Sequence, residues 1–227
     1  MRIRYQMLLT AMLFAVLAVP ASAAVTNPVI DFSAESFAKE GTRTVDEQFS
    51  QVNDELVILG TVAQFQEPFD DLDPNAPGVE YTYVMDGMIS LGTTQSGSGP
   101  IKSYTTNYNG GFFRIYEDTT PDADFAAPAT FEDGTLILEG TFSAFQIITN
   151  SLISAGTQTA DLQFTGGSLF SRVSSSGIGT TGIVTGVFNL CADTVPDALE
   201  LEGYFARSDT KIDIVPPTPV RPSTWSL

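Results

Sequence analysis

The chain contains the same β-rich unit twice, in the same internal order, and this duplication constrains its fold more than any other feature. Leu56–Gln66 recurs as Leu136–Gln146, with 5 of 11 positions identical. Gly111–Ala123 recurs as Gly186–Ala198, with 7 of 13 positions identical, including the pattern Asp-Thr-x-Pro-Asp-Ala. Unrelated segments would share about one residue, so the two units should repeat one strand order.

Apolar and polar residues alternate in both units, which predicts strands. Tyr81–Gly87 and Ala160–Gly166 occupy corresponding places and alternate with a period of two. Turn signals such as Asn109-Gly110-Gly111 separate the runs, and no helical period is sustained. We therefore predict an all-β fold, an antiparallel β-sandwich or flattened barrel built from two duplicated β units.

The duplicated β domain should cover residues 53–214, with units at about 53–130 and 131–214. Leu201–Phe205 resembles Leu138–Phe142 and predicts a strand that closes the second unit. We expect one shared core, because neither unit has enough strands to bury both faces of a sandwich. Two separate domains are the alternative.

The two ends of the chain differ from this β domain. Arg2 and Arg4, an apolar run and an Ala-Ser-Ala site predict a signal peptide over residues 1–23. The protein should therefore be exported, to the periplasm or outside the cell, with no stable membrane insertion after cleavage. Residues 24–52 are expected to dock on the β domain as a polar segment, and the Pro-rich residues 215–227 to form a disordered tail.

Charge and residue usage exclude several function classes. The net charge is −17, so the chain should repel nucleic acid and anionic lipid. It has no histidine, which excludes Ser-His-Asp and Cys-His catalysis and the usual zinc sites. Cys191 is the single cysteine, so no intramolecular disulfide can form. We expect no enzymatic activity and assign no catalytic or cofactor-binding residues.

A calcium site is the one metal site that the spacing suggests. Asp71, Asp73 and Asn75 have the alternating oxygen ligands found at the start of calcium loops. The loop is not an EF-hand, since Ala76 stands where the sharp turn needs glycine. The alternatives are calcium held by these three residues and a solvated loop between strands.

Aromatic residues at alternating strand positions suggest a second kind of site. Such side chains either stack on sugars, as in carbohydrate-binding β-sandwiches, or fill the core. A glycosidase would in addition need two carboxylates about 5–9.5 Å apart, which spacing in sequence cannot show. The aromatic residues concerned are Tyr81, Tyr83, Tyr104, Tyr108, Phe112 and Tyr116.

The signal peptide, strands such as Gly111–Asp118 and Gly134–Phe142, and the end Asp213–Pro217 together resemble exosortase-sorted (PEP-CTERM) bacterial surface proteins, most closely the flocculation-associated type. Those proteins carry Val-Pro-Glu-Pro, a transmembrane helix and an arginine cluster. Here Val215-Pro216-Pro217-Thr218-Pro219 is followed by no such helix, so we expect a protein lacking the usual C-terminal anchor. The resemblance implies a role in bacterial aggregation or biofilm, with no catalytic residues to transfer.

These observations predict a secreted, non-enzymatic structural or adhesive protein of the bacterial extracellular matrix or envelope. Its expected partners are matrix polysaccharide or other surface proteins, not nucleic acid. The alternative is a carbohydrate-binding β-sandwich module or glycosidase. Features that the two units share should serve the fold. A specific activity should therefore lie in features of one unit, above all the loop Asp70–Glu80.

Overall fold

A computed structural model of the chain describes residues 29–175 and 179–215, so the predicted signal peptide and nearly all of the predicted tail lie outside the described residues. Four short helical elements accompany the strands: α1 (Phe170–Ser175), α2 (Asp197–Leu201) and the 3-10 helices η1 (Pro128–Phe131) and η2 (Ala192–Thr194). The ten strands are β1 (Ile30–Phe32), β2 (Ser36–Glu40), β3 (Glu55–Phe65), β4 (Glu80–Ser98), β5 (Ile101–Asn109), β6 (Phe112–Asp118), β7 (Thr135–Asn150), β8 (Ala155–Gly166), β9 (Thr181–Asn189) and β10 (Tyr204–Val215).

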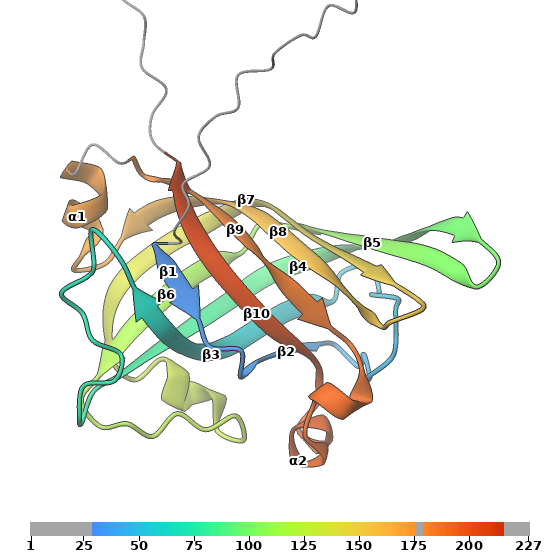
Figure 1. The fold of residues 1–227 in the computed structure, drawn as a ribbon, viewed down its shortest axis with the longest axis horizontal. Coiled ribbons are helices and arrows are strands. Elements are labelled where there is room, and N and C mark those ends of the chain that lie inside the picture. Colours follow the sequence, from blue (N-terminus) through green and yellow to red (C-terminus); the bar gives the residue numbers. More distant parts are fainter. Residues whose placement is uncertain (1–28, 176–178, 216–227) are drawn as a thin grey trace, which may run out of the picture.

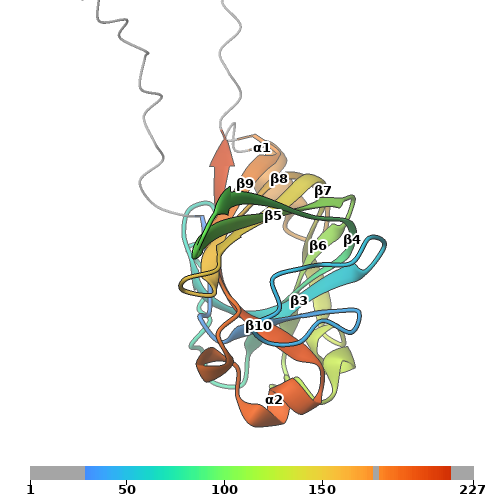
Figure 2. The same cartoon turned by 90° about the vertical axis from the view of Figure 1, so that its right-hand side faces the viewer.

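All ten strands belong to one antiparallel sheet that closes on itself. β3 pairs with β4, and the order then runs through β5 and β6 to β7, β8, β9 and β10. β1 and β2 lie between β10 and β3 and complete the ring (Figures 1 and 2). The predicted all-β, antiparallel architecture is confirmed, and its closed ring matches the flattened-barrel form of that prediction.

The sequence duplication corresponds to a repeated strand order. β3, β4 and β6 of the first unit align with β7, β8 and β9 of the second. In each unit these three strands are neighbours in the sheet, and the third then pairs with the next strand, β7 or β10. The strand expected at Leu201–Phe205 begins later, at Tyr204, because α2 includes Leu201.

Two positions of the ring are each shared by two strands. β6 lies between β4 and β7 along one half of their length, and β5 lies between the same two strands along the other half. β1 and β2 divide the position between β3 and β10 in the same way. The N-terminal segment thus contributes two strands, of 3 and 5 residues, too short for the alternating pattern to have revealed them.

Buried side chains form two clusters, one within the ring and one outside it. The larger cluster combines residues of both units, such as Phe113 and Phe188, which are fully buried. The smaller cluster packs under the segments that follow β6 and β9, and includes Ala123, Phe125 and Val195. The two Asp-Thr-x-Pro-Asp-Ala segments therefore both contribute to one apolar cluster, through Ala123 in the first copy and Val195 in the second.

Candidate functional site

The three residues predicted to bind calcium lie in the loop between β3 and β4, where each acidic side chain already has a protein partner. Asp71 is exposed and forms an ion pair with Arg172, which holds the pKa of its carboxyl below the usual range. Asp73 Oδ1 accepts a hydrogen bond from the backbone N–H of Asn75 at 2.9 Å. These contacts help to shape the loop, and calcium binding by the three residues stays a prediction.

Among the described residues, three other carboxylates do converge. Ligand oxygens of Asp118, Asp122 and Asp133 lie within 4.8 Å of one another. Asp122 is exposed, and desolvation together with the nearby charges of Asp133 and Asp118 raises the pKa of its carboxyl. Asp118 Oδ1 also accepts a hydrogen bond from the backbone N–H of Thr120 at 2.9 Å, so this aspartate caps the turn that follows β6.

Calcium binding can be tested by thermal unfolding. A ligand that binds the native state alone raises the melting temperature. The loop prediction is therefore that calcium raises the melting temperature relative to a chelator, and that Asp73→Ala removes this increase. Asp122→Asn is the comparison variant, because loss of the increase in that variant instead would place the ion at the Asp118 cluster. No increase in the parent protein would contradict both sites.

The aromatic residues considered for sugar stacking mostly fill the core. Tyr81, Tyr83, Tyr104, Tyr108 and Tyr116 are all less than 9 % exposed. Phe112 is the exception, with 44 % of its surface exposed. Stacking of a sugar on the tyrosines is therefore blocked by the packing of their rings.

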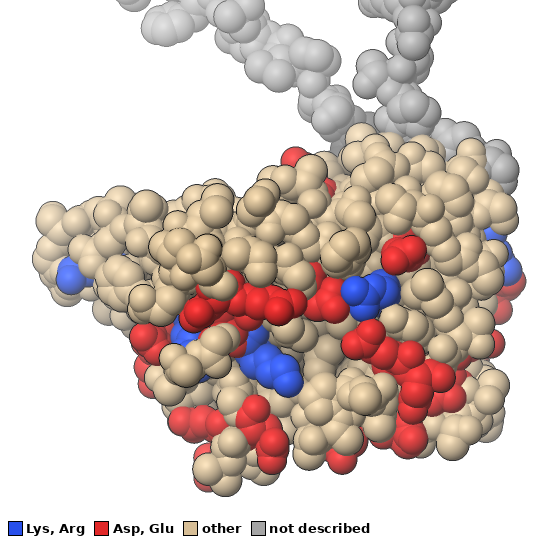
Figure 3. All heavy atoms as spheres, turned by 180° about the vertical axis from the view of Figure 1, so that it is seen from behind, with Lys and Arg blue, Asp and Glu red and all other residues tan. Residues whose placement is uncertain are grey.

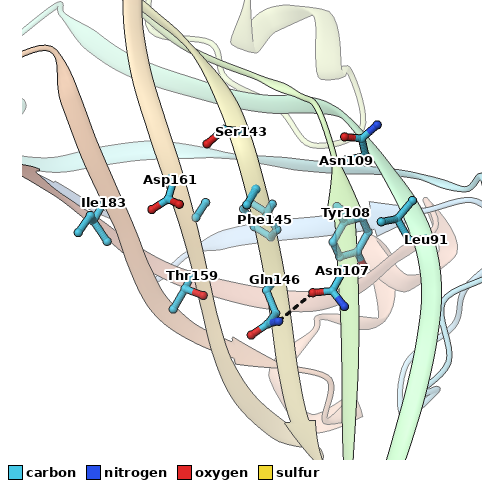
Figure 4. Close-up of a pocket in the computed structure, with 12 residues that line it drawn as sticks. Leu91, Asn107, Tyr108, Asn109, Ser143, Phe145, Gln146, Thr159, Asp161 and Ile183 are labelled. Carbon is cyan, nitrogen blue, oxygen red and sulfur yellow. Dashed lines mark hydrogen bonds between the residues drawn. The ribbon is translucent and has the colours of Figure 1, made fainter.

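A hollow of about 440 Å³ lies on the outer face of the sheet (Figure 4), within the size range of small-ligand pockets. We call it the outer groove. Its floor is formed by β5, β7 and β8, where Tyr108 and Phe145 turn their rings into the core. The lining residues are Leu91, Asn107, Tyr108, Asn109, Ser143, Ala144, Phe145, Gln146, Thr159, Ala160, Asp161 and Ile183.

Strand alternation and register bring the polar side chains of the outer groove together. Asn107, Gln146 and Thr159 lie in one row across β5, β7 and β8, because Asn107 pairs with Gln146 and Gln146 pairs with Thr159. Gln146 Nε2 donates a hydrogen bond to Asn107 Oδ1 at 2.8 Å. Asp161 lies two residues further along β8 and points to the same face, as Figure 4 shows.

Two irregularities in the sheet border the outer groove. The register between β4 and β5 shifts between Ser90 and Thr93, which leaves Leu91 on the outer surface. The register between β7 and β8 shifts between Phe142 and Ala144, so that Ser143 and Ala144 are both exposed. Such bulges bend strands and redirect side chains, and they often occur beside binding sites.

The chemistry of the outer groove is that of hydrogen bonding to an uncharged ligand. Amides and hydroxyls supply both donors and acceptors, and Asp161 supplies the single carboxylate of the lining. Leu91 and Ile183, at opposite sides, offer exposed apolar surface. The lining contains no lysine or arginine, so it has no cation to hold a phosphate or sulfate.

A second group of polar residues is buried beneath the segment that joins β2 to β3. Arg43 Nη1 donates to Glu40 Oε2 at 2.7 Å, and Ser50 Oγ donates to Glu40 Oε1 at 2.5 Å. Arg43 also donates to the carbonyl oxygens of Glu47 and Gln48 and lies over the Phe205 ring. Because these groups use their hydrogen-bonding capacity on one another, the cluster holds the segment in place and is not a candidate ligand-binding site.

No sequence motif singles out the polar residues of the outer groove. The alternating pattern does identify Asn107, Gln146, Thr159 and Asp161 as outward-facing polar positions on strands. Which of these positions become neighbours depends on strand order and register, and neither can be read from one strand at a time.

Within the described residues, no helix has the length and apolar character needed to cross a membrane. In comparisons with known proteins, no family model, no curated protein and no solved structure matches this chain.

Proposed function

We propose that the protein is a secreted, non-enzymatic adhesive protein of the bacterial extracellular matrix or envelope, and that it binds neutral polysaccharide through the outer groove. The observation that carries this proposal is a row of amide and hydroxyl side chains on the surface of a strongly acidic chain. A sugar chain presents many hydroxyl groups, which match such donors and acceptors. The net charge of −17 disfavours a polyanionic partner.

The residues around the outer groove also favour binding over hydrolysis. Glycoside hydrolysis uses a pair of carboxylates, one as acid and one as base or nucleophile. The lining of the outer groove provides Asp161 alone. The predicted export signal and the resemblance to flocculation-associated surface proteins agree with a role among matrix polysaccharides.

We expect purified protein to bind at least one neutral bacterial polysaccharide on a glycan array, and Asp161→Ala to weaken that binding at least about tenfold. A hydrogen bond to a charged group contributes about 1.5–3 kcal/mol, and 1.4 kcal/mol corresponds to tenfold in affinity. Thr159→Ala should weaken binding less, because a neutral hydrogen bond contributes about 0.5–1.5 kcal/mol. Thr157→Ala is the matched control: Thr157 is exposed on the same strand but does not line the outer groove.

Equal binding by Asp161→Ala and Thr157→Ala would remove the outer groove as the binding site. Turnover of chromogenic glycosides, abolished by Asp161→Asn, would instead establish a glycosidase. In the producing cells, deletion of the gene should reduce aggregation or biofilm mass. Unchanged values would contradict the matrix role even if purified protein binds sugar.

A further inference from the structure

The hairpin formed by β4 and β5 leaves one strand edge without a partner in the described part of the chain. β3 pairs with β4 only as far as Ile89, whereas β5 continues along the other side of β4 to Ser98. The hairpin therefore extends beyond the ring (Figure 1). Thr94–Ser98 is exposed throughout and has a ladder partner on one edge only. We call this stretch the open edge.

The open edge lacks the lysine, proline and charged residues by which proteins commonly protect such edges. Free N–H and C=O groups along an edge are a template for another strand, and lysine or proline commonly blocks this pairing. The open edge reads Thr-Gln-Ser-Gly-Ser from Thr94 to Ser98 and contains neither residue, nor any charge. Threonine at its start also favours extended backbone.

The charge distribution indicates which partner can approach. Residues 91–109, which span most of the hairpin, contain one charged residue, Lys102. Acidic side chains are grouped elsewhere on the molecule, across the face seen in Figure 3, where the hairpin extends to the left. Two copies of a chain with net charge −17 repel each other least when they meet at this uncharged projection.

We propose that two copies of this protein associate through their open edges, which pair antiparallel about a two-fold axis at Ser96. In this register Thr94 of each copy lies opposite Ser98 of the other, so the whole open edge is paired and no charged residues meet. The two hairpins then form a continuous four-stranded ribbon. Each strand satisfies backbone groups that the monomer leaves to water.

Pairing would also produce a dimer with two outer grooves, one from each copy. Linked sites bind a polymer with an avidity that exceeds the affinity of either site alone. The association itself does not rest on the proposed function, because it is measured on the purified protein without any ligand.

Sedimentation velocity over a wide range of protein concentration tests the association. We expect a reversible monomer–dimer equilibrium, and we expect Ser96→Lys to weaken the dimer at least about tenfold, since like charges directly opposite each other in a ladder are unfavourable. Thr157→Lys is the matched control: it adds the same charge on the exposed face of β8, which is paired on both sides. A protein that stays monomeric, or a dimer weakened equally by both variants, would overturn the proposal.

Cysteine cross-linking tests the register. In an antiparallel pair, directly opposite Cα atoms lie about 4.5–5.5 Å apart, within the range of about 4.4–6.8 Å that a disulfide spans. In a Cys191→Ser background, Ser96→Cys should therefore form a covalent dimer on oxidation. Ser103→Cys should not, because Ser103 pairs with Ser96 of its own chain and with Asn150 on its other side. Equal cross-linking of both variants would exclude pairing through the open edge.

Discussion

Phe113→Ala should lower the free energy of unfolding by about 3–5 kcal/mol, the usual cost of removing a buried phenylalanine ring. Phe113 is fully buried, and its ring lies 5.9 Å from that of Phe32 and 6.4 Å from that of Phe164. The contact joins the N-terminal strand β1, the first unit and the second unit. The cavity left by alanine therefore lies at the centre of the core that the closed sheet surrounds.

Phe112→Ala is the control, because it removes the same side chain one residue earlier, at a position that is 44 % exposed. Phe112→Ala should lower the free energy of unfolding much less than Phe113→Ala. Phe188→Ala tests the second unit in the same way, since Phe188 is the repeat counterpart of Phe113 and is also fully buried. Urea unfolding followed by circular dichroism measures all three. A loss as large for Phe112→Ala as for Phe113→Ala would contradict the assignment of Phe113 to a shared core.

Arg43→Met should destabilise the protein by about 3–5 kcal/mol, because it leaves a buried carboxylate without its countercharge. The side chains of Arg43 and Glu40 are 2 % and 0 % exposed, and the ion pair joins them at 2.7 Å. Methionine keeps much of the packing against Phe205 but removes the donors that hold the carbonyls of Glu47 and Gln48.

The double variant Glu40→Gln/Arg43→Met separates charge from packing. Replacing both members of a buried ion pair by neutral groups costs less than removing one of them. Thermal and urea unfolding should therefore find the double variant more stable than Arg43→Met alone. If the double variant is the less stable of the two, the unpaired carboxylate is not the cause of the loss.

Some of the fold follows from local patterns in the chain. Tyr81–Gly87 and Ala160–Gly166 alternate with a period of two, and both lie in strands, β4 and β8. The repeats at Leu56–Gln66 and Leu136–Gln146 correspond to β3 and β7, apart from Gln66, which follows the end of β3. The alternating pattern does not predict β1 and β2, because strands of 3 and 5 residues are too short to show a clear period. Their strand structure depends on pairing with β3 and β10.

The candidate sites were harder to anticipate. Asp118, Asp122 and Asp133 converge only because the segment after β6 folds back toward the start of β7. The loop Asp70–Glu80, singled out as a feature of one unit, remains a prediction for calcium. The β4–β5 hairpin is also a feature of one unit, since the second unit has α1 between the corresponding strands. It carries the open edge and one side of the outer groove.

By itself, the sequence determined that this chain is antiparallel and all-β and that its strand order repeats. Period and turn signals are local, so one chain segment is enough to reveal them. The tertiary structure decided that the sheet closes into a ring, which outward side chains meet in the outer groove, and which edge stays open. Those features depend on register and on contacts between residues far apart in the chain. Such contacts form only when the packing of the whole core offsets the entropy of closing the loops.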